Sequence, residues 1–210
     1  MKALGIFFLC FICVLPGCSQ IKKNQDRIVG GPCDRCDLMF EGIPNNLSWT
    51  TSIAKSDEPG VPLIISGTIY NMDGKTPAPD VILYVYQTDI TGRYTPAPDQ
   101  LSAKVHGHLR GWIKTNANGR YQFETIRPAS YPEGNAPQHI HPLVKEPNTS
   151  LYWIDEYLFE DDPLLTARER SRQVNRGGSG IIQLRKNEKG TWIGHRDIIL
   201  GLNIPDYQAK

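Results

Sequence analysis

Two histidines separated by a single residue, His139 and His141, are the first side chains in this sequence with the spacing of a metal site. Side chains on a β-strand alternate between its two faces, so both imidazoles would project from one face and Ile140 from the other. Imidazole binds zinc, copper, iron and nickel alike, so the pair does not choose a metal. Taken alone, such a pair is more often an ordinary surface feature of a strand.

Two tyrosines narrow the choice of metal. Tyr94 and Tyr131 both precede the histidine pair and follow turn-forming residues. A phenol has a pKa of about 10, and it binds well only to a strongly Lewis-acidic, oxygen-seeking cation that displaces its proton. Either tyrosine alone could be a packing aromatic of a sheet. The order and spacing of all four side chains predict a non-haem Fe(III) site.

The elements that must position these side chains are short strands. Runs rich in β-branched and aromatic residues recur between turn signals, and hardly any stretch has the helical period. The pattern predicts an all-β fold, an antiparallel β-sandwich, with a short helix at Arg168–Asn175. The predicted strands are Leu63–Tyr70, Val81–Gln87, Leu109–Lys114, Tyr121–Ile126, His139–Val144, Leu151–Phe159, Ile181–Arg185 and Trp192–Leu200.

With its motifs in this order, the sequence resembles the intradiol ring-cleavage dioxygenases, the family of protocatechuate 3,4-dioxygenase and catechol 1,2-dioxygenase. The resemblance runs from about Leu63 to Asp162 and implies a prealbumin-like β-sandwich core. It is carried by Val81–Gln87, Thr91–Tyr94, Gly107–Thr115, Asn118–Pro128 and Pro137–His141.

The resemblance also implies the ligands and the reaction. Fe(III) would be held by Tyr94, Tyr131, His139, His141 and a hydroxide, with Tyr131 and His141 axial. Tyr94 and Tyr131 would be the catalytic tyrosines, and Tyr131 would leave the metal when a catechol chelates it. Dioxygen would then cleave the ring to a cis,cis-muconate-type diacid. The implied partners are a small catechol and dioxygen, and relatives form oligomers.

Two positions depart from the family pattern. Ala136 stands where the resemblance expects an arginine, and Glu156 stands where it expects a glutamine near the substrate. A carboxylate at that place would disfavour an anionic substrate. A second His-x-His, at His106 and His108, is a weaker metal candidate and is expected at the pocket mouth. The residues that could replace the missing positive charge are Arg93, Arg110, His106 and His108.

The N-terminal sequence predicts export. A short positive segment and an apolar run end in Leu15-Pro16-Gly17-Cys18, which has the form of a bacterial lipobox. Cys18 would be lipidated, and the protein would be a membrane-anchored lipoprotein of the outer membrane or facing the periplasm. An ordinary cleaved signal peptide with a chance cysteine is the alternative. The predicted divisions are a signal at 1–18, a tether and C-x-x-C segment at 19–36, and the sandwich domain at 37–210.

Cys33 and Cys36 are the cysteines left after the signal and Cys18. In an oxidising compartment the pair predicts a local disulfide. A redox C-x-x-C would need a βαβ pattern, and a zinc site would need a second pair of ligands.

Composition limits the function classes. The chain has 210 residues and a formal net charge of +1, so we expect a single sandwich domain and no nucleic-acid partner. Two rivals to a dioxygenase stay open: an exported iron- or catechol-binding lipoprotein without ring cleavage, and a metal-free prealbumin-like module.

Overall fold

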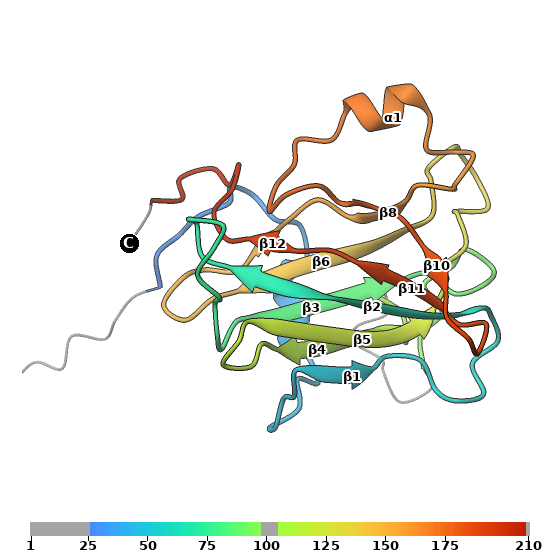
Figure 1. The fold of residues 1–210 in the computed structure, drawn as a ribbon, viewed down its shortest axis with the longest axis horizontal. Coiled ribbons are helices and arrows are strands. Elements are labelled where there is room, and N and C mark those ends of the chain that lie inside the picture. The colour runs from blue at the N-terminus through green and yellow to red at the C-terminus, as the bar shows by residue number, and fades with distance from the viewer. Residues whose placement is uncertain (1–25, 98–104, 209–210) are drawn as a thin grey trace, which may run out of the picture.

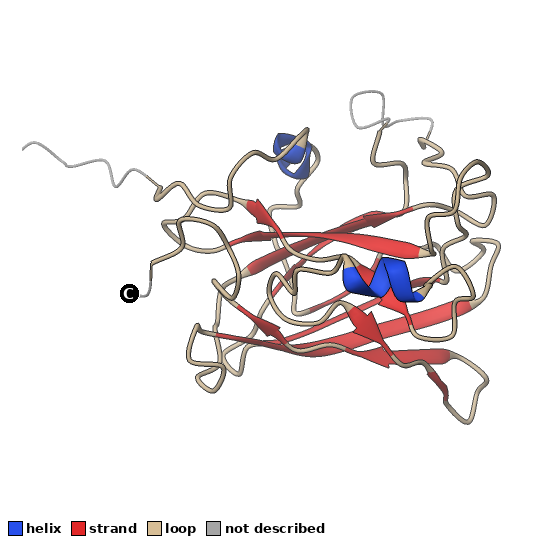
Figure 2. Cartoon of the chain, turned by 90° about the horizontal axis from the view of Figure 1, so that it is seen from above, coloured by secondary structure: helices blue, strands red, loops and turns tan. Residues whose placement is uncertain are grey.

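The computed structural model describes residues 26–97 and 105–208. Two sheets, each of six strands, pack face to face, and one short α-helix lies outside them (Figures 1 and 2). This arrangement confirms the predicted β-sandwich. The predicted signal peptide, with Cys18, lies outside the described residues.

The first sheet is built around β2, whose long apolar pattern is paired on both sides. Its strand order is β1 (Thr50–Ser52), β5 (Arg120–Ile126), β2 (Pro62–Tyr70), β11 (Trp192–His195) and β10 (Arg185–Lys186), with β12 (Ile198–Ile199) also paired to β2.

The second sheet carries the histidine pair near its centre. Its order is β4 (Arg110–Lys114), β3 (Ile82–Gln87), β6 (His139–Lys145), β8 (Tyr157–Phe159) and β9 (Ile181–Ile182), with β7 (Tyr152–Trp153) also paired to β6.

The long strand pairs are antiparallel, as predicted, and four short pairs are parallel. β2 pairs antiparallel with β5, and β3 pairs antiparallel with both β4 and β6. The parallel pairs are β1 with β5, β11 with β2, β12 with β2, and β8 with β9. Each parallel pair joins segments far apart in the sequence, which a local pattern of alternation does not reveal.

The core lies between the sheets and follows the two-residue period of the strands. In β2, Leu63, Ile65 and Ile69 are fully buried, while the alternate residues Ile64, Ser66 and Thr68 are partly exposed. Ile140 of β6 belongs to the same buried cluster. The face of β6 opposite the core is therefore available to its two histidines.

Short elements account for the differences from the predicted strands and helix. The helix α1 spans Ala167–Ser171 with Arg172 as its C-cap, and is shorter than the predicted segment, whose last residue, Asn175, has φ 56°. Thr166 caps its start by accepting a hydrogen bond from the Glu169 backbone N–H at 3.3 Å. The three-residue strand β1 and the 3-10 helix at Cys36–Phe40 have too few residues to give a periodic signal.

Residues 27–36, which the sequence assigns to a segment before the domain, pack against the sandwich. Val29 is 2% exposed within the core cluster, and the Gly30 N–H donates to the Pro205 carbonyl at 2.8 Å. Cys33 and Cys36 are joined in a disulfide. Across the described residues, no helix combines the length and the apolar character needed to span a membrane.

Candidate metal centre

The strand β6 presents His139 and His141 on its face away from the core. His141 lies opposite Tyr86 of β3, and His139 lies opposite Leu158 of β8. The two imidazole centroids are 4.6 Å apart with their planes at 87°. Since both side chains leave the same rigid strand, their spacing is set by the backbone itself.

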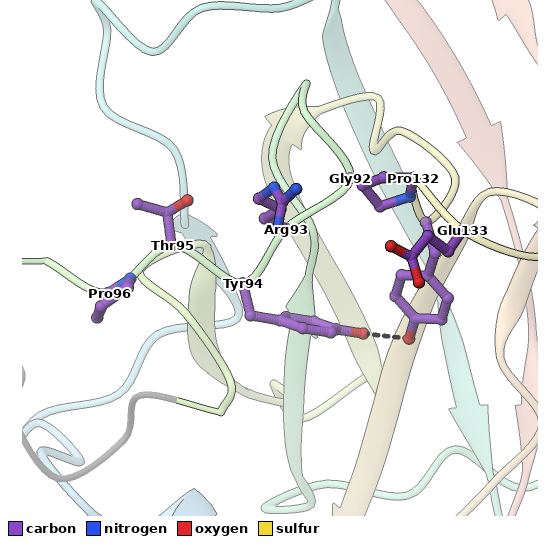
Figure 3. A pocket seen from close by; sticks show the side chains of 8 residues that line it. Gly92, Arg93, Tyr94, Thr95, Pro96, Pro132 and Glu133 are labelled. Atoms are coloured by element: carbon purple, nitrogen blue, oxygen red, sulfur yellow. Dashed lines mark hydrogen bonds between the residues drawn. The ribbon is translucent and has the colours of Figure 1, made fainter.

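Two loops bring the tyrosines to these histidines. Tyr94 lies between β3 and β4, and Tyr131 lies between β5 and β6. The Tyr94 hydroxyl is 2.7 Å from that of Tyr131 and 2.8 Å from His141 Nε2, and the Tyr131 hydroxyl is 3.0 Å from His139 Nε2. Figure 3 shows the contact at the tip of the Tyr94 ring. Two phenol oxygens and two imidazole nitrogens therefore converge on one point.

A hydrogen bond at the far side of the His139 ring selects which ring nitrogen faces the tyrosines. His139 Nδ1 donates to the Pro137 carbonyl at 2.7 Å, because a carbonyl can only accept. Its Nε2 lone pair is then directed at Tyr131, the tautomer that a metal ligand needs. The backbone N–H of Gln138 donates to the Asp162 carboxylate at 2.6 Å, which fixes the start of β6.

Burial favours the uncharged forms of both tyrosines and of His141. Burial raises the pKa of Tyr94, and its hydrogen bond with Tyr131 raises it further. The pKa of Tyr131 is also raised by burial and by the Glu156 carboxylate. The pKa of His141 is lowered by burial and by the neighbouring His139 and His106. Only a strongly Lewis-acidic cation would displace a phenol proton here.

Asp89 organises the loop that carries Tyr94. Its carboxylate accepts from the Thr91 backbone N–H and hydroxyl at 2.8 and 2.6 Å, and from the Thr95 hydroxyl and Arg93 N–H. Burial alone would raise the pKa of Asp89, but these hydrogen bonds outweigh it and hold the pKa below its ordinary value. Asp89 is not among the site residues expected from the sequence. An Asp two residues before a Thr is a turn signal that could have found it.

The two tyrosine loops are fastened to each other. The Thr88 hydroxyl donates to the Ala129 carbonyl at 2.7 Å, and the Ala129 N–H donates to the Asp89 carbonyl at 3.2 Å. Gly92 has φ +74°, and a Cβ there would overlap the Ser130 carbonyl. Close backbone contact at Gly92 thus sets Tyr94 and Tyr131 in one fixed relation.

A stack of aromatic rings supports His141 from one side. The Tyr86 ring lies between His141 and His106, with centroid distances of 4.6 and 3.9 Å and nearly parallel planes. His106 is 3% exposed, and its Nδ1 lies 2.9 Å from the Tyr84 hydroxyl. Burial, with the nearby Arg110 charge, lowers the pKa of His106 to about 4. A neutral imidazole therefore packs behind the candidate ligand.

The second His-x-His does not form a metal pair. His108 turns away from His106, with Nε2 2.9 Å from the Glu58 carboxylate and Nδ1 2.7 Å from the Thr95 carbonyl. His108 therefore supports the Tyr94 loop through its contact with the Thr95 carbonyl. Over residues 26–97 and 105–208, no group of three or more His, Cys, Asp or Glu side chains could hold a metal. The described candidate site depends on its tyrosines, and mixed phenol and imidazole ligands suit ferric iron.

A family model described as Dioxygenase matches residues 43–175, which contain all four converging side chains. The chain belongs to the intradiol dioxygenase family. Members of this family use non-haem Fe(III). The match extends past both ends of the resemblance seen in the sequence.

Curated relatives support this membership at low identity. The chain is 32% identical over 130 residues to the protocatechuate 3,4-dioxygenase beta chain of Burkholderia cepacia, covering 58% of this chain and 55% of that one. It is 31% identical over 140 residues to the catechol 1,2-dioxygenase of Acinetobacter baylyi, covering 59% of this chain and 43% of the relative. The chain thus spans about half the length of these curated relatives.

Solved structures agree on the fold. The dioxygenase domain of a dioxygenase and carbohydrate-binding fusion from Streptomyces sp. SirexAA-E has a TM-score of 0.55 at 25% identity, with 76% of this chain and 94% of that chain covered. Catechol 1,2-dioxygenase from an Acinetobacter species has a TM-score of 0.57 at 22% identity, with 75% of this chain and 58% of that chain covered.

Within this intradiol dioxygenase fold, a cavity of about 630 Å³ opens over the two tyrosines. Arg93 and Glu133 both line it, so its charges are mixed (Figure 3). Arg93 is exposed there. Arg110 lies elsewhere: it is buried and donates to the Glu41 carbonyl at 3.2 Å, over the Trp112 ring. The structure brings only Arg93, among the cations considered from the sequence, to this cavity.

Glu156 lies beside the histidine pair. Its carboxylate is 3.6 Å from His141 Nδ1, and it is the one charged group that acts on the pKa of Tyr131 among the described residues. Ala136 places no charge near the site. Glu156 therefore places a negative charge beside His141 where the sequence resemblance expects a neutral glutamine, and the arginine charge expected at position 136 is absent.

Proposed function

We propose that this protein is a non-haem Fe(III)-dependent intradiol dioxygenase that opens a catechol ring with dioxygen to a cis,cis-muconate-type diacid. The observation that carries the proposal is the convergence of the Tyr94 and Tyr131 hydroxyls on Nε2 of His139 and His141. Family membership of residues 43–175 supports the reaction class.

The four converging side chains would hold the iron, with Tyr94 and Tyr131 as phenolates and both histidines neutral. When bound, ferric iron supplies the Lewis acidity that lowers phenol and catechol pKa values and makes the chelated ring reactive towards dioxygen. The cavity over Tyr94 and Tyr131 admits the catechol. As a phenolate, Tyr131, whose pKa burial raises, would accept a catechol proton as the substrate binds and would become a neutral phenol.

Tyr131 is better suited than Tyr94 to leave the iron. The Tyr94 loop is held by the Asp89 carboxylate, and the Tyr94 ring lies 5.9 Å from Tyr86. The Tyr131 ring meets His139 edge-on at 5.0 Å and faces the open cavity beside Glu133. Because the Asp89 carboxylate anchors the Tyr94 loop, Tyr131 would be the tyrosine that turns away and exchanges places with a catechol oxygen.

A visible absorption spectrum of the full chain loaded with ferric iron tests the proposal. A tyrosinate-to-iron charge-transfer band should form, shift when catechol is added under air, and return as ring-opened product accumulates. A colourless iron-loaded protein would refute the metal site. If the band shifts with catechol but no product forms, iron binding would be supported and ring cleavage would be refuted.

The second candidate function is binding of iron or of a catechol without ring cleavage. It is favoured by one observation: Ala136 stands where the family resemblance expects an arginine, and the cation that lines the cavity, Arg93, is exposed to solvent. A cation near the substrate would stabilise the charge that develops during oxygen attack. Product formation in the absorption experiment separates the two candidates.

We infer that the protein is exported and anchored to a membrane surface through lipid on Cys18. The sequence from Met1 to Cys18 supports this inference, and residues 1–25 lie outside the described structure. The disulfide between Cys33 and Cys36 is consistent with an oxidising compartment.

A further inference from the structure

The connection that carries Tyr131, residues 127–138 between β5 and β6, is anchored on both sides of this tyrosine. Before Tyr131, the backbone of Ala129 is hydrogen-bonded to the other tyrosine loop. After it, residues 132–136 make no hydrogen bond to any other described residue. The second anchor is Gln138, which immediately precedes β6. The position of Tyr131 therefore depends on where the far end of this connection is held.

Arg127 closes the connection by binding that far end. Its Nε donates to the side-chain carbonyl of Gln138 at 2.7 Å, so the first and last residues of the connection are joined. Its Nη1 and Nη2 donate to the Asp161 carboxylate at 2.8 and 2.9 Å, a bidentate pair. These hydrogen bonds hold the pKa of Asp161 below its ordinary value. One guanidinium therefore ties both ends of the Tyr131 connection to the segment that follows β8.

The surroundings of Arg127 hold it in this place. Its side chain is 16% exposed, and its guanidinium lies 5.0 Å from the centre of the buried Phe159 ring. Its backbone N–H donates to the Val61 carbonyl at 2.8 Å. The Asp162 carboxylate accepts from the backbone N–H of Gln138 at 2.6 Å. Arg127 therefore supplies the side-chain half of the anchor at Gln138, and Asp162 supplies the backbone half.

We propose that Arg127 is a positioning residue for Tyr131: by holding Gln138, it sets how firmly Tyr131 stays on the iron and how readily a catechol displaces it. The inference rests on the proposed function, in which Tyr131 is the tyrosine that turns away. Arg127 does not line the catechol cavity, so it acts through the loop. A competing ligand binds more tightly when the bound position of Tyr131 is less favoured.

Anaerobic titration with catechol tests this inference, because catechol binds without turnover when dioxygen is absent. The shift of the charge-transfer band of the iron-loaded full chain gives the Kd. We expect Arg127→Gln to bind catechol about fivefold more tightly than the wild type, the effect of one hydrogen bond. Its band before catechol is added should be weaker. A residue that only stabilised the fold would leave the band unaltered and would not tighten catechol binding.

Matched variants assign the effect to the contact across the loop. Arg127→Lys keeps the charge but lacks the planar fork, so its Kd should lie between those of the wild type and Arg127→Gln. Gln138→Ala keeps the ion pair with Asp161 and should tighten catechol binding even if Arg127→Gln does not fold. Arg170→Gln breaks a similar pair, with Glu160, and should change neither Kd nor band. Urea unfolding of the metal-free variants measures their loss of stability.

The Tyr131→Phe background shows which ligand Arg127 acts on. With no phenolate to displace, the further change Arg127→Gln should leave the catechol Kd unaltered at saturating iron. A tightening that persists in this background would mean that Arg127 acts through His139, and the inference would be overturned. A Kd that is unchanged or raised in both Arg127→Gln and Gln138→Ala would overturn it as well. If catechol shifts no band in the wild type, the proposed function fails first, and the inference fails with it.

Discussion

At the scale of single residues, the candidate site depends on proton loss from two phenols that burial would otherwise keep protonated. Tyrosine is a demanding ligand for this reason, and the two tyrosines are what let residue types alone predict ferric iron, the metal that the family uses. What residue types did not reveal is the orientation of each ring. The Pro137 carbonyl, which selects the His139 tautomer, is a backbone group and leaves no sequence signal.

Removing either phenol oxygen should weaken iron binding. We expect Tyr94→Phe and Tyr131→Phe each to lower ferric affinity by more than about tenfold and to reduce the charge-transfer band. Tyr70→Phe, at the end of β2, is the matched control and should behave as wild type. Competition with a chelator measures the affinity. A variant that kept both its affinity and its band would exclude that tyrosine as a ligand.

The buried His106 predicts a loss of stability in mild acid. Its pKa is lowered to about 4 in the folded protein, so the unfolded chain takes up the proton first as pH falls. Stability should be intact above the unfolded pKa of about 6.5 and should decline by roughly 3 kcal/mol as pH falls through 4.

Urea unfolding of the metal-free protein between pH 7 and pH 4 measures this decline. His106→Gln should flatten it, although the variant is less stable at pH 7 because the stack on Tyr86 is lost. The exposed His195→Gln serves as the control. An unchanged pH slope in His106→Gln would show that another group is responsible.

At the scale of elements, the site joins a rigid strand to two loops. β6 fixes the histidines, and Asp89 with Thr88 fixes the loops relative to each other. The strand could be predicted because alternation is a local property of sequence. The arrangement of the two loops could not be predicted, because it depends on a contact between Gly92 and Ser130. These two residues lie on loops that are far apart in the sequence.

Replacing Asp89 tests whether loop order matters for the iron. Asp89→Ala leaves the Thr91 and Arg93 N–H groups without their acceptor, which should cost about 1–3 kcal/mol of stability and lower iron affinity. Asp89→Asn keeps one oxygen for these donors and should restore most of the stability and most of the iron affinity. Equal iron affinity and an identical band in the alanine variant would mean that β6 and the tyrosines suffice.

At the scale of the whole molecule, the sandwich could be predicted from the number and spacing of strand patterns. Which strands become neighbours could not, as the parallel pairs of β11 and β12 with β2 show. Residues 27–36 illustrate the same limit, because no local pattern in this segment indicates that Val29 enters the core. Burial of a short segment depends on the surface it meets.

The anchor proposed at Cys18 predicts where the protein is found after cell fractionation. The full chain should sediment with membranes, and Cys18→Ala should release it or leave its signal uncleaved, because the lipid is lost. Metabolic labelling with a fatty acid should mark the wild type alone. A wild type that is soluble and unlabelled would support an ordinary cleaved signal instead.

The pairing of β2 has a consequence for the order of events during synthesis. β2 is made early, yet its free edge waits for β11 along one half and β12 along the other, well over a hundred residues later. Until Ile198 and Ile199 emerge, that edge is an open template for other chains. Folding should therefore finish only after the last strand is made, which suits a polypeptide delivered unfolded to another compartment.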